Sequence, residues 1–168
     1  PQGPTRMRVR VQGAGAVSPC GTTAVGEVED YTVNVTAAPA PPTNDGCSAA
    51  FSIADGTTPG TTFLSTYNPA DGTSTCDPTG NDVWYSYTAT LTGNLSIRTC
   101  TSAIDTVVSV YPTPCGSAAI ACNDDCGGSP CGGPASCLTL SITSGTTYLI
   151  RVSDKSIGTG GSFNLTLS

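Results

Sequence analysis

The residue types that carry most enzymatic chemistry are scarce in this sequence. It contains no histidine, which excludes Ser-His-Asp and Cys-His catalysis and every histidine-based zinc site. A serine or threonine nucleophile would depend on Lys155, the one lysine, which we expect to be solvated in a polar turn. The glutamates Glu27 and Glu29 lie on one short segment, whereas a glycoside hydrolase places its two carboxylates on opposite sides of the substrate. We therefore predict that the chain is not an enzyme.

A run of oxygen-bearing side chains, Asn123, Asp124 and Asp125, suggests a metal site. Together with Asp105 or Asp82, these groups could bind Ca²⁺, which takes roughly six to eight oxygen ligands. The alternative is a polar turn in a glycine-rich loop, in which Asn and Asp side chains bond to nearby backbone groups. The sequence leaves both interpretations open, and Ca²⁺ is the one cofactor that it suggests.

The two glutamates raise a related question. They are in phase with the residues that we expect to face inward on the following strand, namely Tyr31, Val33 and Val35. A buried carboxylate needs a partner. Either the strand starts at Asp30, or Glu27 and Glu29 meet a cation or an arginine.

Nine cysteines indicate an oxidising, extracellular compartment and a disulfide framework. Cys20 stands apart, and we predict that it is a free thiol or pairs outside this chain. We expect the other eight to form four bridges in the main domain: Cys47, Cys76, Cys100, Cys115, Cys122, Cys126, Cys131 and Cys137. Eight cysteines allow about 105 connectivities, so a local pairing such as Cys47–Cys76 and Cys100–Cys115 is a guess. The last four could instead bind zinc, but their spacing and the compartment favour disulfides.

Trp84, Tyr85 and Tyr87 could form a sugar-binding platform, since aromatic faces stack on pyranose rings. Packing in the core is the commoner fate of aromatic residues on a central strand, and we favour it here.

Three Asn-X-Ser/Thr sequons begin at Asn34, Asn94 and Asn164. They are candidate glycosylation sites, although such sequons also arise by chance in a threonine-rich chain. Glycans are therefore one possible class of partner.

The overall charge excludes two classes of partner. A net charge of −6 argues against nucleic acid, which requires a basic face, and against attachment to anionic lipid. No apolar run approaches the roughly 18 residues that span a bilayer, so we predict no membrane insertion. No signal peptide is visible at Pro1, and we expect the signal of a secreted protein to be removed or to lie upstream.

The elements that position these residues are short strands. Alternation of apolar and polar residues predicts two strands in residues 1–36, and a Pro/Ala linker, residues 37–43, follows them. Residues 44–168 contain regularly spaced strands separated by turn signals, with at most one or two helical turns at 47–53. The predicted fold is all-β: a disulfide-stapled, jelly-roll-like antiparallel β-sandwich, preceded by an N-terminal β-hairpin from an incomplete second β-domain.

Two family resemblances rest on particular strings. Residues 5–35, with the strand TRMRVR and the string GEVEDY, resemble the C-terminal half of a GEVED domain, an extracellular β-module of bacterial surface and secreted proteins. Residues 44–168 resemble bacterial pre-peptidase C-terminal-like β-sandwich modules through NDGCSAAFSI, DVWYSYT, IDTVVSVY, ACNDD and GTTYLIRVS…GSFNLTLS. The second resemblance implies a non-catalytic spacer, adhesive module or substrate tether, and some members bind Ca²⁺ or a polymeric substrate.

The half-domain carries the leading functional hypothesis. Its apolar side must be covered by another segment, either from upstream domains of the same polypeptide or from a neighbouring subunit: Met7, Val9, Val11, Tyr31, Val33 and Val35. Self-association by strand complementation would build a head-to-tail fibre, which Cys20 could lock. We therefore expect an extracellular structural or adhesive subunit. The alternative is a carbohydrate- or protein-polymer-binding accessory module of a secreted hydrolase.

Overall fold

The computed structural model describes residues 2–13, 20, 26–155 and 158–168. The chain forms two compact units, residues 1–39 and residues 40–168, and each is described here by itself. Among the described residues, no helix is long and apolar enough to cross a membrane.

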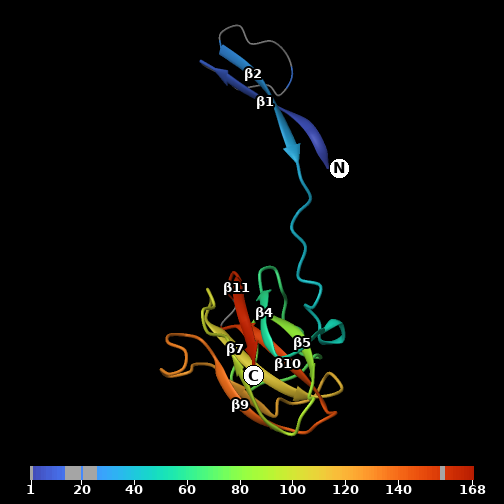
Figure 1. The fold of residues 1–168 in the computed structure, drawn as a ribbon. Coiled ribbons are helices and arrows are strands. Elements are labelled where there is room, and N and C mark those ends of the chain that lie inside the picture. The colour runs from blue at the N-terminus through green and yellow to red at the C-terminus, as the bar shows by residue number, and fades with distance from the viewer. Residues whose placement is uncertain (1, 14–19, 21–25, 156–157) are drawn as a thin grey trace. The chain divides into compact units, whose positions relative to one another are not determined.

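The first unit is a two-stranded antiparallel sheet of β1 (Gly3–Gln12) and β2 (Gly26–Val35) (Figure 1). The register pairs Met7 with Tyr31 and Val9 with Glu29. The strand therefore begins before Asp30, and both glutamates lie on the same face as the apolar residues. The alternative in which this strand starts at Asp30 is therefore wrong. Glu29 is instead bonded by the Tyr31 hydroxyl.

The two faces of this hairpin differ in chemistry. One face, called here the apolar hairpin face, exposes six large side chains to solvent: Met7, Val9, Val11, Tyr31, Val33 and Val35. The other face carries the arginines of β1, of which Arg8 bonds to both carboxylate oxygens of Asp30 at 2.6 and 2.7 Å. In the loop that joins the strands, residues 14–19 and 21–25 lie outside the described residues, and Cys20 is exposed.

The second unit is a sandwich of two sheets, which confirms the predicted fold class (Figure 1). The five-stranded sheet has the order β3 (Phe51–Ile53), β5 (Asp82–Thr88), β10 (Thr147–Asp154), β7 (Thr106–Pro112) and β8 (Ala121–Asn123). The four-stranded sheet has the order β4 (Gly56–Thr61), β11 (Ser162–Leu167), β6 (Gly93–Arg98) and β9 (Cys137–Ile142). Neighbouring strands are antiparallel except β3 and β5, which are parallel.

The core lies between the two sheets and is built from alternate residues of each strand, because successive side chains of a strand point to opposite faces. β5, β7 and β10 contribute Tyr85, Val108 and Ile150, among others, and β6 and β11 contribute Ile97 and Leu165. All five of these side chains are buried.

The outer face of the five-stranded sheet is also covered. Trp84, Tyr111 and Leu149 form a second buried cluster there with Cys47 of the short 3-10 helix Cys47–Ala49. Only one helical turn therefore forms at this place, and the strand β3 follows it. Trp84 and Tyr111 pack with their ring centroids 5.0 Å apart.

The disulfides join segments that are distant in sequence. The structure pairs all eight cysteines from 47 to 137, as Cys47–Cys115, Cys76–Cys122, Cys100–Cys131 and Cys126–Cys137. The guessed pairing Cys47–Cys76 and Cys100–Cys115 is wrong, because the sandwich brings together residues up to 68 positions apart. The zinc interpretation of the last four cysteines is also wrong, because each of their sulfurs is already in a disulfide bond.

Candidate functional sites: an aromatic groove and an acidic cluster

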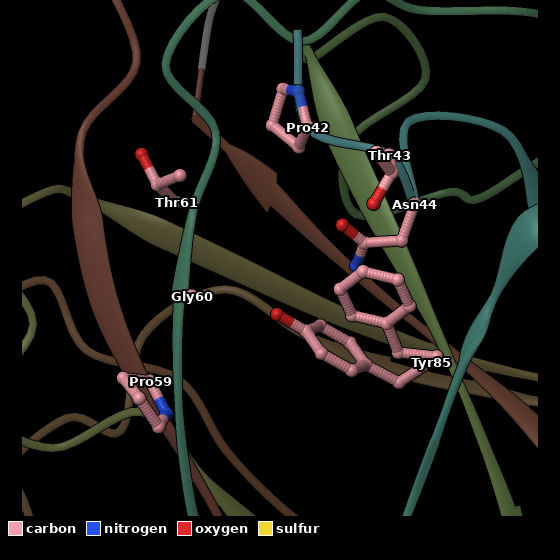
Figure 2. Close-up of a pocket in the computed structure, with 8 residues that line it drawn as sticks. Pro42, Thr43, Asn44, Pro59, Gly60, Thr61 and Tyr85 are labelled. Carbon is pink, nitrogen blue, oxygen red and sulfur yellow. The ribbon is translucent and has the colours of Figure 1, made fainter.

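A groove of about 430 Å³ opens between the edge strands β3 and β4 of the two sheets (Figure 2). It is called here the aromatic groove, and its lining comes from both edges, from β5 and from the segment before the 3-10 helix: Pro42, Thr43, Asn44, Phe51, Pro59, Gly60, Thr61 and Tyr85. None of these eight described residues has a charged side chain.

The polar wall of the groove is held in place by the neighbouring strand. Asn44 is only 3% exposed, and its Nδ2 donates to the Trp84 carbonyl at 2.9 Å. The Trp84 N–H donates in return to the Asn44 carbonyl at 2.9 Å. Asn44 is therefore fixed as firmly as a strand residue, although it lies in an irregular segment.

The aromatic wall depends on one glycine. The Tyr85 hydroxyl points toward the strand that carries Pro59 and Gly60 (Figure 2). A Cβ at Gly60 would lie 2.3 Å from the Tyr85 oxygen and 2.4 Å from the Phe163 ring, so this position has room only for glycine. Burial raises the pKa of Tyr85, so its hydroxyl stays neutral over the physiological pH range.

Phe51 completes the groove from β3 and is 47% exposed. An exposed phenyl ring beside threonine hydroxyls can stack on an apolar ring face and hydrogen-bond to hydroxyl groups.

The alternative of a sugar platform made of Trp84, Tyr85 and Tyr87 is wrong, and the favoured prediction of core packing holds. Trp84, Tyr85 and Tyr87 are each less than 5% exposed, which confirms that they pack in the interior. Sequence reasoning missed Phe51 and Asn44. The short β3 gives no clear alternation, and the approach of β3 to β4 is a tertiary contact.

The acidic run is part of a second candidate site. Carboxylate oxygens of Asp105, Asp124 and Asp125 lie within 4.8 Å of one another and form a group that could hold a metal ion, called here the acidic cluster. Lys155 forms an ion pair with Asp124, so it is not simply solvated as predicted. Burial, and then the neighbouring charge of Asp125, raise the pKa of Asp105.

Two oxygens of the cluster have no hydrogen-bond partner. Asp105 Oδ1 and Asp124 Oδ1 are both buried and unbonded. With three carboxylates and one ammonium group, the cluster carries a formal charge of −2 when all are ionised. A divalent cation would satisfy both the charge and the unbonded oxygens.

Two residues predicted for this site, Asp82 and Asn123, form hydrogen bonds elsewhere in the structure. Asp82 lies in a buried ion pair, with its Oδ2 at 2.6 Å from Arg151 Nε and its Oδ1 at 2.8 Å from Trp84 Nε1. Asn123 uses its Oδ1 to accept a bond of 2.7 Å from the Cys137 N–H, while its Nδ2 donates to the Asp125 carbonyl. Asp82 is therefore a structural residue, and Asn123 positions the loop.

The other predicted site residues are spread over the strands. The sequon residues Asn34, Asn94 and Asn164 lie on β2, β6 and β11, and glycosylation stays a prediction. Glu27 and Glu29 lie on one face of β2 rather than on two sides of a cleft.

Two known domain families match this chain. Residues 43–166 match the model of a galactose binding domain-like family associated with the type IX secretion system (T9SS). The chain belongs to this galactose binding domain-like family. Residues 1–34 match the GEVED domain, which confirms the predicted identity of the hairpin. No curated protein matches the chain significantly.

Two solved structures are similar to the galactose-binding-like domain. One is the pre-peptidase C-terminal domain of a collagenase from Bacillus anthracis, with a TM-score of 0.49, 13% identity, and coverage of 71% of this chain and 94% of that chain. The other is a periplasmic inhibitor of g-type lysozyme from Aeromonas hydrophila, with a TM-score of 0.39, 11% identity, and coverage of 71% and 97%.

The family and the disulfides together confirm the predicted location. A T9SS-associated domain with four disulfides is secreted and functions outside the cell. Galactose-binding-like domains are typically non-catalytic modules.

Proposed function

We propose that this protein is a non-catalytic accessory module of an extracellular protein and that its galactose-binding-like domain binds a carbohydrate polymer in the aromatic groove. The observation that carries this proposal is the exposed ring of Phe51 in an uncharged groove that Thr43 and Thr61 also line. The description of the family is consistent with a sugar ligand.

The composition of the groove favours a neutral sugar. Single neutral hydrogen bonds contribute only about 0.5–1.5 kcal/mol each, so affinity depends on combining them with burial of the ring face. The threonine hydroxyls and the Phe51 ring supply both kinds of contact in one place.

Affinity electrophoresis in gels containing neutral polysaccharides would test this proposal. We expect the wild-type chain to be retarded in at least one neutral polysaccharide and the Phe51→Ala variant to migrate freely. Leu91→Ala is the matched control, because Leu91 is exposed but does not line the groove. Binding to protein fibres in place of all polysaccharides would favour the protein-polymer form of the accessory role. Unchanged binding by Phe51→Ala would contradict the proposal.

We also propose that the acidic cluster binds Ca²⁺ and stabilises the loop between β8 and β9. The support is the pair of buried, unbonded oxygens on Asp105 and Asp124. A ligand that binds only the folded state raises stability by about RT ln(1 + [L]/Kd), so Ca²⁺ should raise the melting temperature.

Thermal unfolding with and without Ca²⁺ tests this site. Asp124→Asn should remove the Ca²⁺-dependent increase, whereas Glu27→Gln, a carboxylate outside the cluster, should retain it. Equal melting temperatures of the wild-type chain in Ca²⁺ and in a chelator would contradict the proposal.

A second candidate function, that of a structural or adhesive subunit assembling head to tail, is favoured by the apolar hairpin face. A two-stranded sheet is marginal in water, and this one exposes six large side chains on one face. Light scattering should then show concentration-dependent association that Met7→Lys weakens. A monomer at all concentrations would leave only the accessory role.

A further inference from the structure

The turn that directly follows the groove-lining Thr61 displays two large apolar side chains. Phe63 is 49% exposed and Leu64 is 40% exposed, at the centre of the tight turn Thr62–Ser65, called here the Phe63 turn. The turn is closed by the Ser65 N–H and hydroxyl, which both donate to the Thr62 carbonyl, at 3.0 and 2.8 Å.

The backbone of this turn is strained. Leu64 has a φ of 63°, in the left-handed region that favours glycine. Strain of this kind persists only where the surroundings fix it.

Both ends of the turn are firmly anchored. Before it, the Thr62 N–H donates to the Gly161 carbonyl at 3.0 Å. After it, the Thr66 N–H and hydroxyl donate to the Asp45 carboxylate at 2.6 and 2.8 Å. The apolar tip is therefore presented on a rigid base.

The anchors also place the turn relative to the groove. It begins directly after Thr61, which lines one wall, and it is tied back to Asp45, the neighbour of Asn44 on the other wall. Thr61 and Asn44 can be followed in Figure 2. The Phe63 turn is thus anchored to both segments that line the groove, directly after Thr61 on one side and through Asp45, next to Asn44, on the other.

A second turn shows that this frame does not require apolar residues. In the turn 99–102, the Ser102 N–H and hydroxyl donate to the Thr99 carbonyl at 3.2 and 2.6 Å, and Thr101 has a φ of 65°. Its central residues are Cys100, in a disulfide, and the polar Thr101. The exposed pair Phe63 and Leu64 is therefore not a requirement for forming the turn.

We infer that the Phe63 turn is a second contact for the sugar polymer, so that the site binds an internal stretch of at least two consecutive units of a neutral polysaccharide rather than a single terminal sugar. This inference rests on the proposed function of the groove. Phe51 contacts one unit, and Phe63 contacts the next unit as the chain leaves the end of the groove. The uncharged lining and the net charge of −6 both disfavour an anionic polymer.

Calorimetric titration with galactose and with neutral galactan oligomers of increasing length tests the inference on the full chain. We expect wild-type affinity to rise with oligomer length. Phe63→Ala should remove this rise, with a loss of roughly tenfold for the longer oligomers and no change for the monosaccharide. Ile120→Ala, which removes an equally exposed apolar side chain outside the groove, should behave as the wild type.

The outcomes separate this inference from the proposed function. If Phe63→Ala keeps the length dependence while Phe51→Ala weakens every ligand, the groove binds sugar and the second contact is overturned. If the wild-type chain binds none of these sugars or other neutral polysaccharides, the proposed function fails and the inference fails with it. Binding to phosphatidylcholine vesicles that requires Phe63 would overturn the sugar contact in favour of a lipid surface. Melting temperatures of all variants would show whether a loss of binding reflects unfolding.

Discussion

Arg151 organises the covered side of the five-stranded sheet. Its guanidinium is 1% exposed and donates to the Asp82 carboxylate at 2.6 Å and to the carbonyls of Asp77 and Gly80 at 2.7 and 2.8 Å. Asp77 is bonded in turn by the Ser153 hydroxyl at 2.6 Å. One buried side chain thus fixes the long segment between β4 and β5 to the sheet.

Removing this arginine should be costly. Arg151→Met leaves the Asp82 carboxylate buried without its cation, and breaking one partner of a buried pair costs about 3–5 kcal/mol. Lys155→Met is the control, because the Lys155–Asp124 pair is about one-third exposed and such pairs contribute about 0–1 kcal/mol. Denaturant unfolding measures both. A loss below about 1 kcal/mol for Arg151→Met would show that the pair is not a structural anchor.

The pH dependence of stability follows from Asp82. Burial raises its pKa from 3.8 to about 6, which outweighs the opposing effect of Arg151. The folded state therefore holds this proton more tightly than the unfolded state. The stabilisation is complete below pH 4 and is lost as the pH rises through 6, and it amounts to roughly 2–3 kcal/mol.

Unfolding curves between pH 4 and 7 check this prediction. The decrease in unfolding free energy over this range should be smaller in Asp82→Asn, which cannot titrate. Parallel curves for the two proteins would show that Asp82 does not change its protonation on unfolding in this range.

At the scale of elements, β4 is a strand that the sequence does not predict. Its string, GTTPGT, contains a proline and two glycines, which are typical of turns. Pro59 is tolerated because β4 is an edge strand, and Gly60 is needed because Tyr85 and Phe163 occupy the space of its side chain. The features that argue against a strand are therefore those that build the groove.

Gly60→Ala should both destabilise the domain and distort the groove. Overpacking of this kind costs about 1–3 kcal/mol, and displacement of Tyr85 should weaken sugar binding. Gly93→Ala is the control, because a Cβ at the start of β6 meets no atom within 4 Å. Thermal unfolding and the binding assay would measure both effects. Equal behaviour of the two variants would show that β4 can move away.

At the scale of the whole molecule, the two units differ in their means of stability. Residues 40–168 contain a two-sheet core and all four disulfides, whereas residues 1–39 contain a single hairpin. A single hairpin has no second layer in which to bury its apolar face.

We therefore expect residues 40–168 to fold independently. Their melting temperature should equal that of the full chain within about 2 °C, and an isolated peptide of residues 1–39 should show no cooperative unfolding. Circular dichroism measures both. A cooperative transition of the peptide alone would mean that the hairpin is stable without a covering partner.

The sequence by itself determined the fold class, the extracellular location and most strands of the sandwich. Alternation along β6 and β11 matches the side chains that are buried, whereas β5 and β10 are buried on both faces. Cysteine density indicates the compartment. These properties are local or compositional, so one chain is enough to read them.

Only the tertiary structure decided the disulfide partners, the role of Asp82 and the location of the groove. Cys47 meets Cys115, Asp82 meets Arg151, and Phe51 and Gly60 line one groove, because strands from two sheets pack across long stretches of chain. Pairings of this kind depend on strand order. Strand order is fixed by the packing of the whole domain rather than by any local pattern of residues.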